Sequence, residues 1–252
     1  MANLLPRDSS TYKVRDLEII VWTELRVPPS EELDTHQWTG HFQPLVQASG
    51  HHTSLWARIR ERPNIVLLVT LWKSQADLRN FTVSPCAQIF WENLAGRGVS
   101  RLASHETIYR DNWFTSLQHS FIQLFWVYFP APVDEAQLAR ISDPKKRGLR
   151  PPATGPGIPL SHRPARHIPA QEWATQTEFL HDQEVQLMLW PHFWGDEKKA
   201  EWRNGPTFLM IPGTACVMGT QTRMEAFRTL LEELGSIEWK EEFCEFEQLP
   251  RV

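Results

Sequence analysis

The predicted elements of this chain repeat in the same order, and such a repeat limits the possible folds more than any other feature of the sequence. In the first half, β-branched and aromatic runs predict strands, and segments that open with Ser and acidic residues predict helices, with Ser30 expected to cap the first one. The strands are predicted at 17–27, 53–60, 65–72 and 99–109, and the helices at 30–48 and 74–93. The order β-α-β-β-α-β is that of a ferredoxin-like unit.

The second half of the chain repeats this order with different residues. Strands are predicted at 121–129, 173–180, 185–190 and 237–246, and helices at 133–141 and 222–234. We therefore expect an α+β fold of tandem ferredoxin-like units, the first over residues 1–112 and the second over residues 113–252.

Two insertions distinguish the second half from the first. Residues 142–172 are rich in proline and in basic residues, which is typical of a mobile linker or of a long loop that acts as a lid over a cavity. The segment 193–212 carries Trp194, Trp202 and Phe208 and is a candidate to close another side of the same space.

Charge and cysteine usage limit the classes of protein. A net charge of −4 argues against a general nucleic-acid binder, which normally has a strong basic excess. The longest apolar run, 121–130, is too short for a transmembrane helix, and the N-terminus lacks a signal-peptide core. The three cysteines are far apart and are interpreted as reduced thiols. We expect a cytoplasmic monomer or homodimer whose partner is a small apolar molecule.

The content of 12 Trp and 13 Phe residues has two interpretations. These side chains either fill the core or form the walls of a cavity for an apolar ligand. The second interpretation predicts an aromatic-lined pocket, and its candidate substrate-binding residues are Trp22, Trp38, Trp56, Trp72, Phe90 and Trp126.

Known catalytic motifs are missing from the sequence. It contains no glycine-rich phosphate loop, no Gly-x-Ser-x-Gly elbow and no His-Glu-x-x-His pair. His36 and His41 are five residues apart and do not share a helix face well, so they make a poor metal pair. We predict neither a metal site nor a cofactor.

Three residues are candidates for catalysis. His41 lies beside the apolar stripe of the first helix and would be a neutral base if buried, although a backbone carbonyl is an equally ordinary partner for it. His52 begins a strand and is either a second base or a solvated strand end. Tyr128 lies on the same strand face as Trp126 and either donates to a substrate oxygen or packs in the core.

Acidic residues crowd the last predicted strand. Their alternation with apolar residues is imperfect, and we interpret them as a solvated edge of the sheet rather than as paired catalytic carboxylates. They are Glu238, Glu241, Glu242, Glu245 and Glu247.

One stretch resembles a known superfamily. The strand that ends in Trp72, the helix start Ser74-Gln75-Ala76-Asp77 and the break at Ser84-Pro85 resemble the dimeric α+β barrel proteins, which include the antibiotic-biosynthesis monooxygenase and stress-responsive barrel families. The resemblance covers residues 17–109 well and residues 121–246 by order of elements. It implies that two fused units close their sheets into a pseudo-dimeric barrel, with a cavity between each sheet and its helices and chemistry without metal, flavin or nicotinamide.

These observations leave three functional hypotheses open. The first is a cofactor-independent enzyme that cyclises, isomerises or performs a cycloaddition on a small apolar natural product by holding and hydrogen-bonding it. The second is a cofactor-independent monooxygenase that acts on a polycyclic phenol. The third is a non-enzymatic stress-responsive or ligand-binding barrel with a packed interior.

Overall fold

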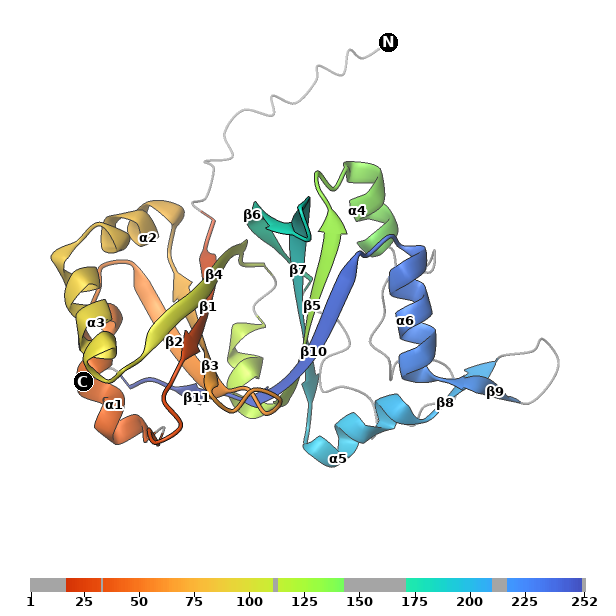
Figure 1. Cartoon of the computed structure of the whole chain (residues 1–252), viewed down its shortest axis with the longest axis horizontal. Coiled ribbons are helices and arrows are strands. Elements are labelled where there is room, and N and C mark those ends of the chain that lie inside the picture. Colours follow the sequence, from red (N-terminus) through yellow and green to blue (C-terminus); the bar gives the residue numbers. More distant parts are fainter. Residues whose placement is uncertain (1–16, 33, 111–112, 143–170, 210–216, 251–252) are drawn as a thin grey trace, which may run out of the picture.

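The computed structural model describes residues 17–32, 34–110, 113–142, 171–209 and 217–250. In the first unit, four strands form a sheet in the order β4-β1-β3-β2, with three helices on its outer side (Figure 1). The elements are β1 (Ile19–Arg26), α1 (Thr35–Val46), β2 (His51–Arg58), β3 (Ile65–Trp72), α2 (Gln75–Thr82), α3 (Pro85–Gly96) and β4 (Ser100–Ile108).

The second unit repeats this arrangement. Its strands lie in the order β10-β5-β7-β6, which matches the first unit strand for strand and confirms the tandem ferredoxin-like fold. The elements are β5 (Phe121–Pro130), α4 (Glu135–Ser142), β6 (Glu172–Leu180), β7 (Gln183–Trp194), α6 (Arg223–Glu233) and β10 (Glu238–Glu245). The domain boundary between residues 112 and 113 stays a prediction.

Several short elements were not predicted. Three of the six lie within the second insertion, which forms two short helical turns and one strand of a small two-stranded sheet. They are η1 (Phe114–His119), α5 (Glu197–Ala200), η3 (Glu201–Asn204), β8 (Pro206–Leu209), β9 (Val217–Thr222) and β11 (Glu247–Gln248).

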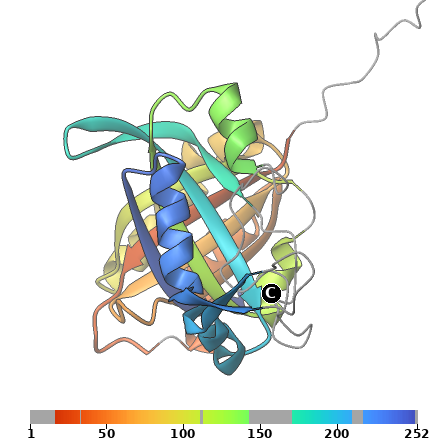
Figure 2. The same cartoon turned by 90° about the vertical axis from the view of Figure 1, so that its right-hand side faces the viewer.

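The two sheets join into one barrel with helices on two opposite sides. At one seam β4 pairs with β6 through Thr107 and Ala174. At the other seam the chain leaves β10, passes Phe246 and pairs with β2 through β11. Figure 2 views the molecule from the side of α6, with the second sheet in front of the first. Fusion of the units thus produces within one chain the barrel that the resemblance implies.

Side-chain caps fix where most helices begin. Ser74 and Ser84 accept hydrogen bonds from the backbone at Asp77 and Ala87, as the Ser-rich starts predict. The expected cap at Ser30 is wrong, because Asp34 caps α1 by accepting from the His36 amide and the helix begins at Thr35. Residues 29–32 form a turn and irregular backbone instead.

Strand β7 continues past its predicted end at Trp190 to Trp194. Pro191 does not stop it, because β6 pairs with β7 only as far as Leu189, so Pro191 has a strand neighbour on one side alone. Proline is tolerated at such an edge position since its missing N–H is not needed there. The extension carries His192 and Phe193 into the second unit's sheet.

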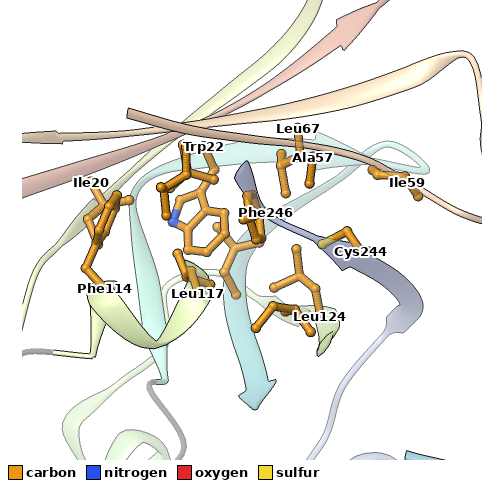
Figure 3. Packing of buried hydrophobic residues seen from close by; sticks show 14 of the residues in the cluster. Ile20, Trp22, Ala57, Ile59, Leu67, Phe114, Leu117, Leu124, Cys244 and Phe246 are labelled. Atoms are coloured by element: carbon orange, nitrogen blue, oxygen red, sulfur yellow. The ribbon is translucent and has the colours of Figure 1, made fainter. Parts of the chain in front are cut away.

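Three large hydrophobic cores and a smaller cluster around Trp194 and Phe243 lie in the described part of the chain. One large core lies inside the barrel and contains Trp22, Trp113 and Trp126 from both units; Figure 3 shows part of it. A second lies between the first sheet and its helices, and a third around Trp190 and Phe227 lies between the second sheet and its helices. Most tryptophans are therefore core side chains, which is the first of the two interpretations of the aromatic content.

One prediction falls almost wholly outside the described residues. Residues 143–170 contain nearly all of the Pro-rich insertion, so the choice between linker and lid is a prediction about residues that are not described. Within the described residues, no helix is long and apolar enough to cross a membrane.

Candidate active site at the polar end of the barrel

The inner face of the barrel changes from apolar to polar along its strands. Strand register places Trp22 opposite His105, Trp126 opposite Lys240 and Leu124 opposite Glu242, so these side chains share the inner face. We call the polar part of this face the polar barrel end. It consists of Glu24, Arg62, His105, Tyr128, Glu178, Lys240 and Glu242.

An ion network crosses from the first unit to the second at this end. Arg62, in the turn between β2 and β3, contacts Glu24 of β1 and places its Nε 2.6 Å from Glu242 Oε1 on β10. Lys240 Nζ lies 3.3 Å from Glu24 Oε1. Burial opposes ionisation of Glu24, but the Arg62 hydrogen bond and the charges of Lys240 and Arg62 outweigh it and hold the pKa of Glu24 below its ordinary value.

Trp126 lies between an imidazole and an ammonium group. The His105 ring meets the indole edge to face at 5.6 Å between centroids, and Lys240 Nζ lies 4.2 Å from the centroid of the indole. Burial lowers the pKa of His105, and although the charge of Glu24 opposes this, the net direction is downward. His105 is therefore neutral at pH 7 and can accept a proton.

Tyr128 and Glu178 are held in their protonated forms more strongly than usual. Burial, followed by the negative charges of Glu178, Glu24 and other carboxylates, raises the pKa of Tyr128. Burial also raises the pKa of Glu178, against the charge of Lys240. Tyr128 is thus a hydroxyl donor at neutral pH, next to a carboxyl group with a raised pKa.

Several polar atoms at this end have no protein partner. Glu178 Oε1, Glu242 Oε2 and Trp126 Nε1 are buried without a hydrogen bond. In the described part of the chain, the His105 ring and the Tyr128 hydroxyl make no hydrogen bond either. Buried polar groups are nearly always hydrogen-bonded in folded proteins, so this convergence indicates a place for bound molecules.

The opposite part of the barrel interior is closed by packing. The turn η1 places Trp113 and Phe114 against the inner face, where the Trp113 ring stacks on Trp22 with centroids 6.0 Å apart. Trp113 Nε1 donates to Glu172 at 2.9 Å, which satisfies this buried pair. The apolar end therefore serves as core, and the titratable side chains of the inner face lie at the polar end.

The three predicted catalytic residues do not lie together. His41 is half-buried on α1, with its ring 6.1 Å from that of Trp38. His52 is exposed on β2, 3.6 Å from Glu18. Tyr128 alone lies on the inner face of the barrel, where it packs against the interior core. A catalytic role for His41 and His52 stays a prediction.

The predicted substrate-binding residues divide between two cores. Trp22 and Trp126 belong to the barrel interior. Trp38, Trp56, Trp72 and Phe90 pack together between the first sheet and its helices, in the space where the resemblance implies a cavity. These large rings pack against one another, so they form a core rather than the walls of an open pocket.

A cleft of about 550 Å³ lies on the outside of the seam between β2 and β11. Among the predicted binding residues, only Trp56 contributes to its wall, and charged side chains supply most of the rest. The full lining is Pro29, Glu31, Glu32, Trp56, Ala57, Arg58, Arg60, Glu245 and Glu247. Its polar walls do not match the aromatic-lined pocket predicted from the composition.

Sequence reasoning missed most of the polar barrel end, although a signal existed. Glu24 follows Ile20 and Trp22 at a spacing of two residues and is the acidic member of an apolar strand face. On β10, Lys240 and Glu242 share one face in the same way. The interpretation of Glu242 as part of a solvated edge is wrong, because closure of the barrel buries it to 3% exposure.

Comparison with solved structures supports the fold. The chain matches an anthrone oxidase-like protein at 12% identity and a TM-score of 0.51, over 94% of this chain and 95% of that one. It also matches a provisionally assigned monooxygenase from Fusobacterium nucleatum (10% identity, TM-score 0.48, 92% and 94% covered). A chlorite dismutase variant from Candidatus Nitrospira defluvii matches at 9% identity and a TM-score of 0.47, with 90% of each chain covered.

Comparison of the sequence itself gives no match to a family model and none to a curated protein. Strand order and the structural match together show that the chain has the dimeric α+β barrel fold, with both barrel halves in one polypeptide.

Proposed function

We propose that this chain is an enzyme that isomerises or cyclises a small, largely apolar molecule at the polar barrel end by moving a proton. One observation carries the proposal. A neutral imidazole and a protonated phenol, neither hydrogen-bonded within the described residues, lie on one half-buried face beside a fixed cation. Groups whose surroundings shift their pKa values in a cleft-like setting are typical of catalytic sites.

The proposed step needs three side chains. His105 removes a proton from a carbon that lies between a carbonyl group and a carbon–carbon double bond, and the electron pair moves to the carbonyl oxygen to give a dienolate. The Tyr128 hydroxyl donates a hydrogen bond to that oxygen, and the charge of Lys240 stabilises it. The imidazolium of His105 then returns the proton to a different carbon, so the product is an isomer and no oxidant or reductant is consumed.

Deuterium exchange tests the proposal without knowledge of the natural substrate. The full chain is incubated in D2O with a panel of polycyclic ketones and phenols, including anthrone, and incorporation is followed by proton NMR. We expect His105→Gln to slow exchange by about 100-fold, the usual loss on removal of a general base. His36→Gln, on the exposed face of α1, is the matched control and should retain the wild-type rate.

Variants of His41 and His52, the two histidines that the sequence predicts to be catalytic, make the test decisive. Exchange that falls in His41→Gln or His52→Gln but not in His105→Gln would move the active site out of the barrel and contradict the proposal.

The monooxygenase hypothesis shares the same base. His105 would remove the proton of a phenol, and dioxygen would be the oxidant of the resulting phenolate. The structural likeness to an anthrone oxidase-like protein, at 12% identity, supports the fold alone, so this second candidate rests on the same base as the first. An oxygen electrode used on the same panel separates the two, because isomerisation consumes no oxygen.

The packed interior favours the non-enzymatic hypothesis. Trp22, Trp113 and Trp126 occupy the barrel where a substrate would otherwise lie. A chain without exchange or oxygen uptake on any compound of the panel would support a binding or scaffold role.

A further inference from the structure

We propose that the cleft outside the seam between β2 and β11 binds a small zwitterion with an apolar side chain, such as an aromatic amino acid. The carboxylate lies on Arg58, the ammonium group toward Glu32 and the apolar side chain against Trp56. This site lies outside the barrel, so the inference goes beyond the proposed function and does not depend on it.

The cleft is a cavity with three walls. Its volume of about 550 Å³ is within the range of small-molecule sites. Residues 29–32, which precede α1, form one wall, the end of β2 forms a second, and the chain from β10 into β11 forms a third. Arg58 joins the first two walls, because its Nη2 donates to the Glu31 carbonyl oxygen at 3.0 Å and its Nη1 donates to the carbonyl oxygen of Pro63.

Arg58 is a cation of the cleft whose charge no carboxylate neutralises. Both of its hydrogen-bond partners are backbone carbonyl oxygens, and it makes no ion pair with any residue that the structure describes. Arg60, two residues further along the chain, is instead paired with Glu197 at 2.6 Å and with Glu245 at 3.2 Å. A guanidinium group has five N–H donors, so Arg58 keeps donors for the carboxylate of a ligand.

Glu32 is the acid of the cleft whose charge is likewise not neutralised. The other three acids, Glu31, Glu245 and Glu247, have interaction partners, whereas the exposed side chain of Glu32 has neither a hydrogen bond nor an ion pair in the described part of the chain. Because Arg58 donates to the carbonyl oxygen of Glu31, the backbone of Glu32 begins beside that guanidinium group. A ligand with one charge would leave the other side chain unmatched, and a zwitterion matches both.

Trp56 provides an independent observation that points to a ligand. It lines the cleft, is only 2% exposed and is held by the rings of Trp38 and Phe42 at 5.5 and 5.2 Å between centroids. Its indole N–H has no hydrogen bond within the described residues and, unlike that of Trp126, is not enclosed by protein atoms. Trp56 and Arg58 are two residues apart on β2 and share one strand face, so both can donate to the same carboxylate.

Calorimetry on the full chain at pH 7 tests the proposal with three probes that share one carbon skeleton. Phenylalanine carries both charges, phenethylamine carries only the ammonium group and 3-phenylpropanoate carries only the carboxylate. We expect phenylalanine to bind at least tenfold more tightly than either of the other two. Equal or tighter binding of a singly charged probe, or no binding of any probe, would overturn the proposal.

Two variants assign the two charges to the named residues. In Glu32→Gln, phenylalanine should lose at least tenfold in affinity and bind no better than 3-phenylpropanoate. In Arg58→Gln, phenylalanine should lose as much and bind no better than phenethylamine. Glu135→Gln and Arg79→Gln remove the same charges at exposed positions outside the cleft, and they should retain the wild-type affinities.

The test does not depend on the stability of one variant. Because the Glu32 side chain makes no hydrogen bond or ion pair within the described residues, Glu32→Gln should fold even if Arg58→Gln does not. Unchanged phenylalanine affinity in Glu32→Gln would contradict the assignment of the ammonium group. His105→Gln should bind phenylalanine as the wild type does, and a loss in that variant would place the ligand in the barrel and overturn this proposal without touching the proposed function.

Discussion

The two ends of the barrel interior are built from the same strands and differ in whether their buried polar atoms have hydrogen-bond partners. At the apolar end, Trp22 and Trp113 stack, and the indole N–H of Trp113 is paired with Glu172. At the polar end, a third tryptophan, Trp126, lies on the same inner face. Its indole N–H has no hydrogen-bond partner, and its neighbours are titratable side chains. One end is a core whose buried polar atoms are paired, and the other keeps buried polar atoms without a protein partner.

The comparison predicts opposite responses to mutation. Changes at the apolar end should cost stability and leave ligand binding intact, and changes at the polar end should do the reverse unless they break the ion network.

Trp22→Ala should have the largest effect. The side chain is fully buried and packs against Trp113, so its loss leaves a cavity that the rigid barrel cannot fill. Truncation of a buried Trp typically costs about 3–5 kcal/mol in the free energy of unfolding. Urea unfolding followed by circular dichroism measures it, with Tyr128→Phe as the polar-end control, which should lose less than about 1 kcal/mol. Similar losses in both variants would contradict the distinction between the two ends.

Most of the architecture could be predicted from the sequence because it is carried by local patterns. The continuous apolar run of β3 and the Ser caps at Ser74 and Ser84 place their elements correctly. The repeated order of elements then implies the tandem fold. Local patterns do not predict which residues pair across the seams. The closure by β11, for example, depends on only two residues, Glu247 and Gln248.

The candidate site was mostly unpredictable for the same reason. Tyr128 was identified because its strand alternates clearly. His105 lies on a strand with exposed polar residues, and only pairing with Trp22 shows that it faces inward. Arg62 reaches Glu242 across 180 residues of chain, a contact that no spacing rule contains.

Arg62→Ala should have the second largest effect. It leaves Glu24 and Glu242 buried without their shared partner, at side-chain exposures of 10% and 5%. Removal of one partner of a buried ion pair costs about 3–5 kcal/mol, and because the Arg62 side chain is one-third exposed we expect about 2 kcal/mol.

Arg60→Ala is the matched control for the ion network. Arg60 also joins the units through Glu197 and Glu245, but these partners are more than half exposed and should contribute less than about 1 kcal/mol. Urea midpoints of the two variants check the difference. Equal losses would show that burial of the network does not matter.

The last predicted change is a pH dependence that originates outside the barrel. His192 is fully buried in the core between the second sheet and its helices, against Phe125 and Trp190, and burial lowers its pKa to about 3. The unfolded chain binds a proton at this residue below about pH 6.5, while the folded chain does so only near pH 3, so stability is lost as the pH falls between these values.

From pH 7 to pH 5 this linkage should remove about 2 kcal/mol, at about 1.4 kcal/mol per pH unit below the unfolded value. His192→Phe should flatten the slope of unfolding free energy against pH in this range by that amount. His105→Gln should flatten it less, because that ring is only partly buried and faces both Glu24 and Lys240. A steeper contribution from His105 than from His192 would mean that the polar barrel end is as dry as the core, and the contrast between the two ends of the barrel would then lose its physical basis.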